Sequence, residues 1–250
     1  MRLTLLGTGN AAQVPVYNCH CVACQRAHQD STFRRGPCSA LIEHDDQRWL
    51  VDAGQVDLTR RFPPHSLSGI LQTHYHADHA QGLLQLRWGQ DMRIPVLGPP
   101  DPEGLGDLYI NPGILDFSKA LDAFESVQLG PLAVTPLPLN HTKLTYGYAF
   151  TDGTAHFAYL TDTIGLPSDT HDYLCQNPLD LLVIDCTYAP QPEAPRNHND
   201  LTRALETIGQ LPVEKAVLTH ISHDLDAWLM ANPDALPANV SVAKDGDIFP

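Results

Sequence analysis

The sequence has few basic residues and no long apolar run. Its 250 residues include 15 Lys and Arg against 29 Asp and Glu, which gives a formal net charge of −14. A surface of this charge repels phosphate backbones and argues against broad nucleic-acid binding. No apolar stretch approaches the roughly 18 residues of a membrane helix, and "MRLTLLGTGN" lacks the pattern of a secretory signal. We therefore expect a cytoplasmic protein without a membrane or nucleic-acid partner.

Cysteine is also scarce, with six residues in the chain. A disulfide scaffold is not expected in a long chain without an export signal. Cys19, Cys21 and Cys24 form a C-x-C-x2-C motif, which suits a tetrahedral zinc ion that needs one more ligand. His223 is a suitable fourth ligand, and His20, inside the motif, is a less well placed alternative. The other cysteines are expected to be small buried apolar residues: Cys38, Cys175 and Cys186.

Strand-like and helix-like segments alternate along the chain without a repeat or a long linker, so we expect one domain over residues 1–250. Neighbouring strands without helices between them predict an α/β (α+β) fold of two stacked mixed sheets flanked by helices. The expected strands cover 3–6, 39–44, 48–51, 69–73, 94–98, 132–139, 146–150, 156–161, 181–184 and 215–219. The expected helices cover 80–88, 201–211 and 224–232, with Asp200 or Asn199 as the N-cap of the second.

Six of these strands are followed directly by an aspartate or a histidine: Asp52, His74, His141, Asp162, Asp185 and His220. Ligand sites in open sheets gather at the carboxyl ends of strands, so these side chains are expected to converge. Asp52 either orients a ligand histidine or caps its strand end, and the sequence leaves both alternatives open. We expect Asp185 to be structural rather than catalytic.

The segment "HYHADH" concentrates His74, His76, Asp78 and His79 within six positions. The composition of the chain predicts only about 0.003 chance matches to H-x-H-x-D-H. A tight loop can turn the first two side chains to one side and the last two to another. Imidazole and carboxylate together suit Zn, Mn or Fe. Two ions need more ligands than this segment offers, which the residues at the strand ends can supply.

The segment "THYHADH" resembles the signature of the metallo-β-lactamase superfamily, whose fold is an αββα sandwich with a dinuclear metal site at its edge. The resemblance extends to His141 in "LPLNHTKL", Asp162 in "AYLTDT" and His220 in "LTHISH". It implies one metal site with three histidines: His74, His76 and His141. It implies a second site beside the first, with Asp162 bridging the two: Asp78, His79 and His220.

Within this superfamily the chain resembles the phosphoribosyl 1,2-cyclic phosphate phosphodiesterases of the carbon–phosphorus lyase pathway of phosphonate catabolism. The segments that carry the resemblance are "NCHCVACQRA", "LLQLRWGQDMRIPVLGPPD", "NPGILDF", "PRNHNDL" and "THISHDLDAWLM". The implied reaction is hydrolysis of 5-phospho-α-D-ribosyl 1,2-cyclic phosphate to α-D-ribose 1,5-bisphosphate. Gln13 departs from the pattern, because the related sequences usually have glycine there, and this change could alter the rim of the pocket.

The same resemblance assigns roles to single residues. His198 in "PRNHNDL" is the implied general acid, although a lone loop histidine is more often a plain surface residue. Asp78 is counted with it as catalytic, in addition to its role as a ligand. Lys143, Tyr146 and Arg196 flank the site in sequence and could meet a distal phosphate, or could serve as surface and packing residues. The implied metals are Mn at the dinuclear site, with Zn or Fe as alternatives, and one structural Zn bound by the cysteines and His223.

Two other functions share the fold. A transfer-RNA 3′-end nuclease has a similar ligand set, but this chain is acidic and has no long basic insertion. A non-hydrolytic carrier protein is the second alternative, and it need not keep all seven ligands. A homodimer is one option for the assembly.

We expect three metal ions per chain: two at the dinuclear site and one zinc at the cysteine motif. Elemental analysis of protein purified without a metal-binding tag measures this number. A single ion per chain, with phosphodiesterase activity intact, would contradict the dinuclear scheme.

Overall fold

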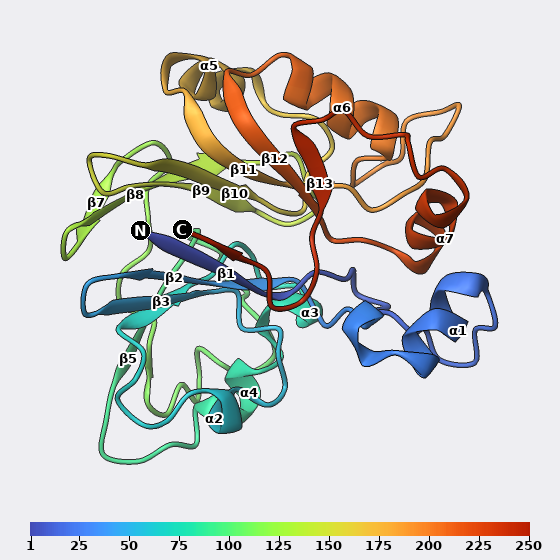
Figure 1. Cartoon of the computed structure of the whole chain (residues 1–250). Helices are drawn as coiled ribbons and strands as arrows, with labels where there is room; N and C mark the ends of the chain where they lie inside the picture. Colours follow the sequence, from blue (N-terminus) through green and yellow to red (C-terminus); the bar gives the residue numbers. More distant parts are fainter.

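Two β-sheets pack face to face, and helices cover their outer faces (Figure 1). The computed structural model describes residues 1–250. The first sheet contains β14 (Ile248–Phe249), β1 (Arg2–Gly7), β2 (Ser39–His44), β3 (Gln47–Val51), β4 (Gly69–Leu71), β5 (Ile94–Leu97) and β6 (Leu115–Asp116), in this order. The second contains β13 (Val240–Val242), β12 (Val213–Thr219), β11 (Leu179–Asp185), β10 (His156–Leu160), β9 (Tyr146–Thr151), β8 (Leu132–Pro138) and β7 (Val127–Leu129). This architecture confirms the predicted αββα sandwich.

Each sheet has an antiparallel part that continues into a parallel part. Strands β1 to β3 pair antiparallel, and β3 to β6 pair parallel. In the second sheet, β8 to β10 pair antiparallel and β10 to β13 pair parallel. Every segment predicted as a strand forms one, with ends that differ by at most two residues. The carboxyl ends of the parallel strands meet at one edge, which is where the loops with aspartate and histidine converge.

The core lies between the two sheets and continues beneath the helices. On β11, Leu181 and Val183 pack between the sheets, whereas Leu182 and Ile184 pack beneath the outer helices. This period of two places apolar side chains on both faces, as a strand buried on both sides requires. The central strands are therefore fixed from two directions, and the loops at their ends start from a rigid base.

The helices are short, and in Figure 1 some lie on the two outer faces whereas others lie at the edge of the sandwich. Their bounds are α1 (Val22–Gln29), α2 (Leu58–Arg61), α3 (Ala77–Ala80), α4 (Leu83–Leu86), α5 (Ser168–Gln176), α6 (Leu201–Gly209) and α7 (His223–Ala231). Asp200 is the N-cap of α6, because its side chain accepts a hydrogen bond from the Arg203 N–H at 3.0 Å. None of the helices combines the length and the apolar character that crossing a bilayer requires.

The predicted helix over 80–88 is wrong, because the structure has two short helices there, α3 and α4. The backbone of Gly82 breaks the run: its N–H donates to the carbonyl of Ala53 at 2.8 Å. A Cβ at Gly82 would collide with the carbonyl oxygens of Ala53 and Gln55. The glycine thus allows the metal-ligand segment to pack directly against the loop that follows β3.

Gly82→Ala is expected to lower the free energy of unfolding by about 1–3 kcal/mol, because the added methyl group meets rigid backbone. Gly209→Ala at the end of α6 is the matched control, since nothing lies within 4 Å of its Cβ position. Urea unfolding of both variants measures the difference. Equal stabilities would contradict the close packing described for Gly82.

Candidate metal centre

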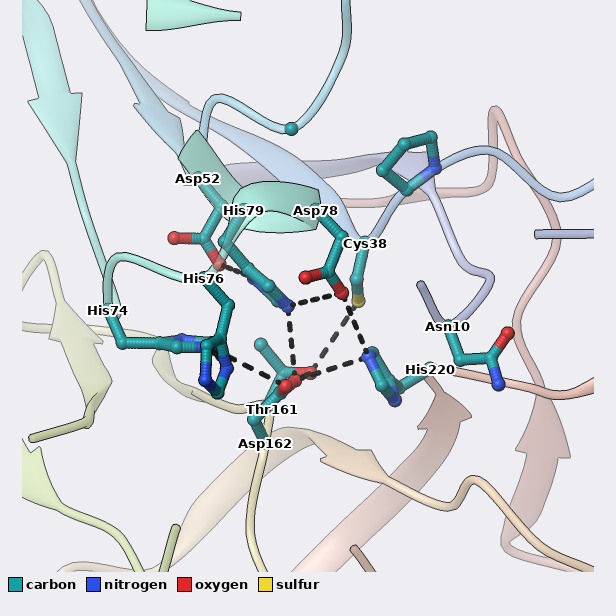
Figure 2. Close-up of polar contacts among 12 residues, drawn as sticks. Asn10, Cys38, Asp52, His74, His76, Asp78, His79, Thr161, Asp162 and His220 are labelled. Carbon is teal, nitrogen blue, oxygen red and sulfur yellow. Dashed lines mark hydrogen bonds and ion pairs between the residues drawn. The ribbon is translucent and has the colours of Figure 1, made fainter. Parts of the chain in front are cut away.

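The histidine-rich segment lies at the edge where the parallel strands of both sheets end. His74 follows β4 and its adjoining loop, and Asp78 and His79 lie on the short helix α3. His76 has an extended backbone and is the N-cap of α3, so the chain turns between the two pairs of side chains. Figure 2 shows all four side chains directed toward Asp162.

The first group of potential ligands contains three histidines and one aspartate. The Nδ1 atom of His76 lies 2.9 Å from Nε2 of His74 and 3.0 Å from Nε2 of His141. Oδ2 of Asp162 lies 3.6 Å from Nε2 of His74 and 3.7 Å from Nε2 of His141. The four ligand atoms all lie within 4.8 Å of one another, which is compatible with a single metal ion.

The second group contains Asp78, His79, His220 and the same Asp162. Oδ1 of Asp162 lies 3.3 Å from Nε2 of His79 and 3.4 Å from Nε2 of His220. Oδ2 of Asp78 lies 3.5 and 3.8 Å from these two nitrogens. Asp162 thus presents one oxygen to each group, which is the geometry that a bridging carboxylate requires. The structure brings together the two ligand sets and the bridge that the resemblance implies.

Two buried nitrogen atoms indicate that these residues fit metal ions. Nε2 of His79 and Nε2 of His220 have no hydrogen-bond partner, although both are shielded from water. An unsatisfied buried polar atom costs about 1–3 kcal/mol, so such atoms need a partner. Both nitrogens face carboxylate oxygens, and a divalent cation between them would satisfy all of these groups. Imidazole and carboxylate are suitable donors for Zn, Mn or Fe.

Each of four ligand histidines has its other ring nitrogen held by a neighbouring oxygen. The contacts are His74 with Thr73 Oγ1 at 3.0 Å, His79 with Asp52 Oδ2 at 2.7 Å, His141 with the Asn197 carbonyl at 3.2 Å, and His220 with Thr187 Oγ1 at 2.7 Å. Such contacts fix the ring orientation and the tautomer of a ligand histidine. Asp52 also accepts hydrogen bonds from the N–H and the hydroxyl of Thr73, so it both orients a ligand and caps its strand end.

The protonation states of the three histidines in the first ligand group suit metal binding. Burial lowers the pKa of His74, His76 and His141, so these rings are neutral and can donate to a metal. Burial alone would raise the pKa of Asp162, but His220 and His79 hold it well below its usual value. The bridging carboxylate is therefore ionised.

Three residues of the centre have a left-handed backbone conformation. Asp52, Asp162 and His220 each have φ of 61°, a region that non-glycine residues rarely adopt. Each comes at the end of a strand, where the conformation turns the chain sharply. Strain of this kind persists at functional sites where the surrounding structure holds it.

His198 lies against the second ligand group. Its ring stacks on His220 with centroids 4.7 Å apart and lies 5.1 Å from the ring of His141. Its Nδ1 contacts Oδ2 of the buried Asp185 at 2.7 Å. Burial lowers the pKa of His198, but Asp185 overcomes this effect and raises it to about 9. Asp185, which we expected to be structural rather than catalytic, positions this histidine through its carboxylate.

The three residues proposed for a distal phosphate have different surroundings. Tyr146 is wrong as a substrate contact, because β9 directs it into the core, where it is 5% exposed. Lys143 already pairs with Asp101 at 3.3 Å. Arg196 is exposed next to Asn197, whose carbonyl holds His141. Gln13 is exposed and has φ of 59°, a left-handed conformation that glycine adopts without steric cost.

The cysteine motif and His223 form a separate group of ligands. Nδ1 of His223 lies 3.3 Å from Sγ of Cys19 and 3.4 Å from Sγ of Cys21, and Cys24 completes the set. His20 is exposed and lies outside it. Three thiols and an imidazole suit a closed tetrahedral zinc site. The group joins the start of α1 to the start of α7, so we call it the clip. Of the other cysteines, Cys38 and Cys186 are buried as expected, whereas Cys175 is exposed.

Comparison with known proteins identifies the family. The model described as "Beta-lactamase superfamily domain" matches residues 47–221. The chain belongs to this family. Fold, family and ligand groups together describe a member of the metallo-β-lactamase superfamily with residues that could hold a dinuclear metal site and a structural metal.

Several relatives of this superfamily member are similar over different lengths. An octanoyltransferase from Porphyromonas gingivalis is 26% identical over 98% of this chain and 51% of that protein. A coenzyme PQQ synthesis protein B from Xanthomonas campestris is 33% identical over 36% of this chain and 35% of that protein. The chain therefore spans at most about half the length of these curated relatives. A solved structure of a "New Diphosphatase from the PhnP Family" has a TM-score of 0.83 and 26% identity, and the match covers 100% of this chain and 97% of that one.

Cys21→Ser is expected to release the clip metal and to lower stability, because metal binding adds to the free energy of folding. A loss of about 3 kcal/mol lowers the melting temperature of a chain of this size by roughly 6–12 °C. Metal analysis and thermal unfolding measure both effects. Cys175→Ser, at an exposed cysteine outside the clip, is the control. A Cys21→Ser variant that keeps its zinc and its melting temperature would disprove the assignment.

Proposed function

We propose that the protein is a phosphodiesterase that hydrolyses 5-phospho-α-D-ribosyl 1,2-cyclic phosphate to α-D-ribose 1,5-bisphosphate in phosphonate catabolism. The observation that carries the proposal is the contact between His198 and Asp185, which places an oriented acid against the second ligand group. The motifs shared with the phosphodiesterases support it. The full-length similarity to a diphosphatase described as a PhnP-family member supports it as well.

The two ligand groups would hold a pair of divalent ions, Mn in this proposal with Zn or Fe as alternatives. Such ions, when bound, lower the pKa of water and stabilise the charge that develops on phosphoryl oxygens. Asp162 keeps the two groups at a fixed separation, because each of its oxygens faces one of them. Asp78 contributes to catalysis as the partly exposed carboxylate of the second group. The clip would hold zinc and take no part in the chemistry.

His198 supplies the proton that the leaving group needs. Its Nδ1 is engaged by Asp185, so Nε2 remains for the substrate. Water provides the hydroxyl that bonds to phosphorus and gives its other proton to the solvent, which later reprotonates His198, while the bond from phosphorus to O2 of the ribose breaks. His198 then transfers its proton to that oxygen, which leaves as a hydroxyl group. Asp185 stabilises the protonated ring before the transfer and keeps it in place afterwards.

The chain favours this function over the two alternatives. A transfer-RNA nuclease must attract a long polyanion, and the net charge of −14 opposes this. A carrier protein needs neither seven converging ligands nor an aspartate that orients a histidine beside them. We therefore propose a small cyclic sugar phosphate as the substrate and no nucleic-acid partner.

Turnover of the cyclic ribosyl phosphate and of a precursor transfer RNA by one metal-defined preparation tests the proposal. We expect faster turnover of the cyclic phosphate. Efficient trimming of the precursor RNA without action on the cyclic phosphate would overturn the proposed substrate, while the fold and the ligand groups would stand.

His198→Ala is expected to slow hydrolysis of substrates with poor alkoxide leaving groups by about 10²–10⁴-fold, the usual contribution of a general acid. An activated aryl phosphodiester should lose less activity, because its leaving group departs without a proton. His171→Ala, at a histidine on α5 away from the centre, is the control. Equal losses on both substrates would remove the acid role and leave His198 as a positioning residue.

A further inference from the structure

A cleft of about 390 Å³ collects arginines in an otherwise acidic chain. Arg60 and Arg61 of α2 line one side, and Arg34 and Arg35, which precede β2, line another. The only acidic residue in the lining is Asp57. Since the chain has 15 basic residues and a net charge of −14, this cleft reverses the charge of the molecule locally.

Two of these arginines have no balancing carboxylate. The guanidinium of Arg35 is turned away to Asp226, which accepts hydrogen bonds from it at 2.8 and 2.9 Å. Arg61 donates to Asp57 at 2.6 Å. Arg34 donates from Nε to the carbonyl of Ala27 at 3.1 Å, which anchors its side chain and leaves its terminal nitrogens available. The guanidinium of Arg60 is exposed and forms no ion pair or hydrogen bond.

The cleft adjoins the end of α3, the helix that carries Asp78 and His79 of the second ligand group. Gln81 lines the cleft three residues after Asp78, and its amide donates to the carbonyl of Gly54 at 2.9 Å. A Cβ at Gly54 would collide with the carbonyl oxygen of Asp78, so the two segments are in direct contact. A ligand in the cleft would therefore lie beside α3, the helix that carries Asp78 and His79.

We infer that the cleft binds a second phosphate group of the substrate, while the phosphodiester lies at the dinuclear centre. Guanidinium groups bind phosphate through paired, charge-assisted hydrogen bonds, and Arg34 and Arg60 are free to form them. The inference rests on the proposed function for the identity of the substrate. It assigns distal-phosphate recognition to residues other than Lys143, whose charge is already matched by Asp101.

A larger cavity of about 440 Å³ offers a comparison. It is lined by Tyr75, Tyr109 and Phe117, and its lining contains two cations, Arg93 and Lys119, and two aspartates, Asp101 and Asp116. It therefore lacks the excess positive charge of the arginine cleft. Arg93 is exposed like Arg60 and provides a matched control.

The test compares kcat/KM for ribosyl 1,2-cyclic phosphate with and without a 5-phosphate. We expect Arg60→Ala and Arg34→Ala to reduce the preference for the 5-phosphorylated substrate by about 10- to 100-fold, chiefly through KM, since each removes a charge-assisted contact. Arg93→Ala should keep the preference of the unaltered protein.

An unchanged preference in Arg60→Ala and Arg34→Ala, or an equal loss in Arg93→Ala, would overturn the inference while cyclic phosphodiesterase activity would stand. If the unaltered protein hydrolyses neither substrate, the proposed function fails instead. Calorimetry of inorganic pyrophosphate binding to the metal-loaded variants then tests whether the cleft is an anion site. Weaker binding in Arg60→Ala than in Arg93→Ala would support an anion site there, and equal binding would remove it.

Discussion

The carboxylate of Asp162 lies between two clusters of histidines and gives one oxygen to each. Without Asp162 the first cluster has no charge of its own, because imidazole is a neutral ligand, and the second has only the carboxylate of Asp78. The ionised carboxylate of Asp162 supplies negative charge to both at once. Its position follows from the end of β10 and from the left-handed backbone at this residue. Each of the other ligands belongs to one cluster, whereas the side chain of Asp162 belongs to both.

The layer behind the ligands matters as much as the ligands. Asp52, Thr187 and the Asn197 carbonyl each hold the far nitrogen of one histidine, and all of them come from the same edge of the sheets. Asp185 does the same for His198. The rigid, doubly buried strands fix this second layer, and the second layer holds the ligand rings in orientations in which their nitrogens converge. Preorganisation of this kind lowers the cost of binding ions and of reaching the transition state.

The strand pattern allowed the two stacked sheets and the edge of the site to be predicted, because period-two burial is a local property of the sequence, whereas the resemblance to the superfamily supplied the full set of seven ligands. The interruption at Gly82 was missed, since it depends on backbone that lies some thirty residues earlier. Tyr146 was misplaced because closeness in sequence to His141 does not say which face of β9 a side chain occupies. Asp185 follows a strand directly, like the other aspartates of the site, but its contact with His198 was not predicted. The arginine cleft is lined by segments that lie far apart in the sequence, so it could not be predicted from any short stretch of the chain.

The two sheets have the same order of antiparallel and parallel strands, and equivalent strands of the two halves deliver residues to the centre. Asp52 follows β3 and Asp162 follows β10, which are equivalent strands in the two halves, and both have the same φ of 61°. The carboxylate of Asp52 orients His79, whereas that of Asp162 faces both clusters. Each cluster takes two side chains from the half that contains β4 and two from the half that contains β8 to β12. Neither half alone could therefore hold an ion, and the centre exists only at the pseudo-twofold interface where the halves dock.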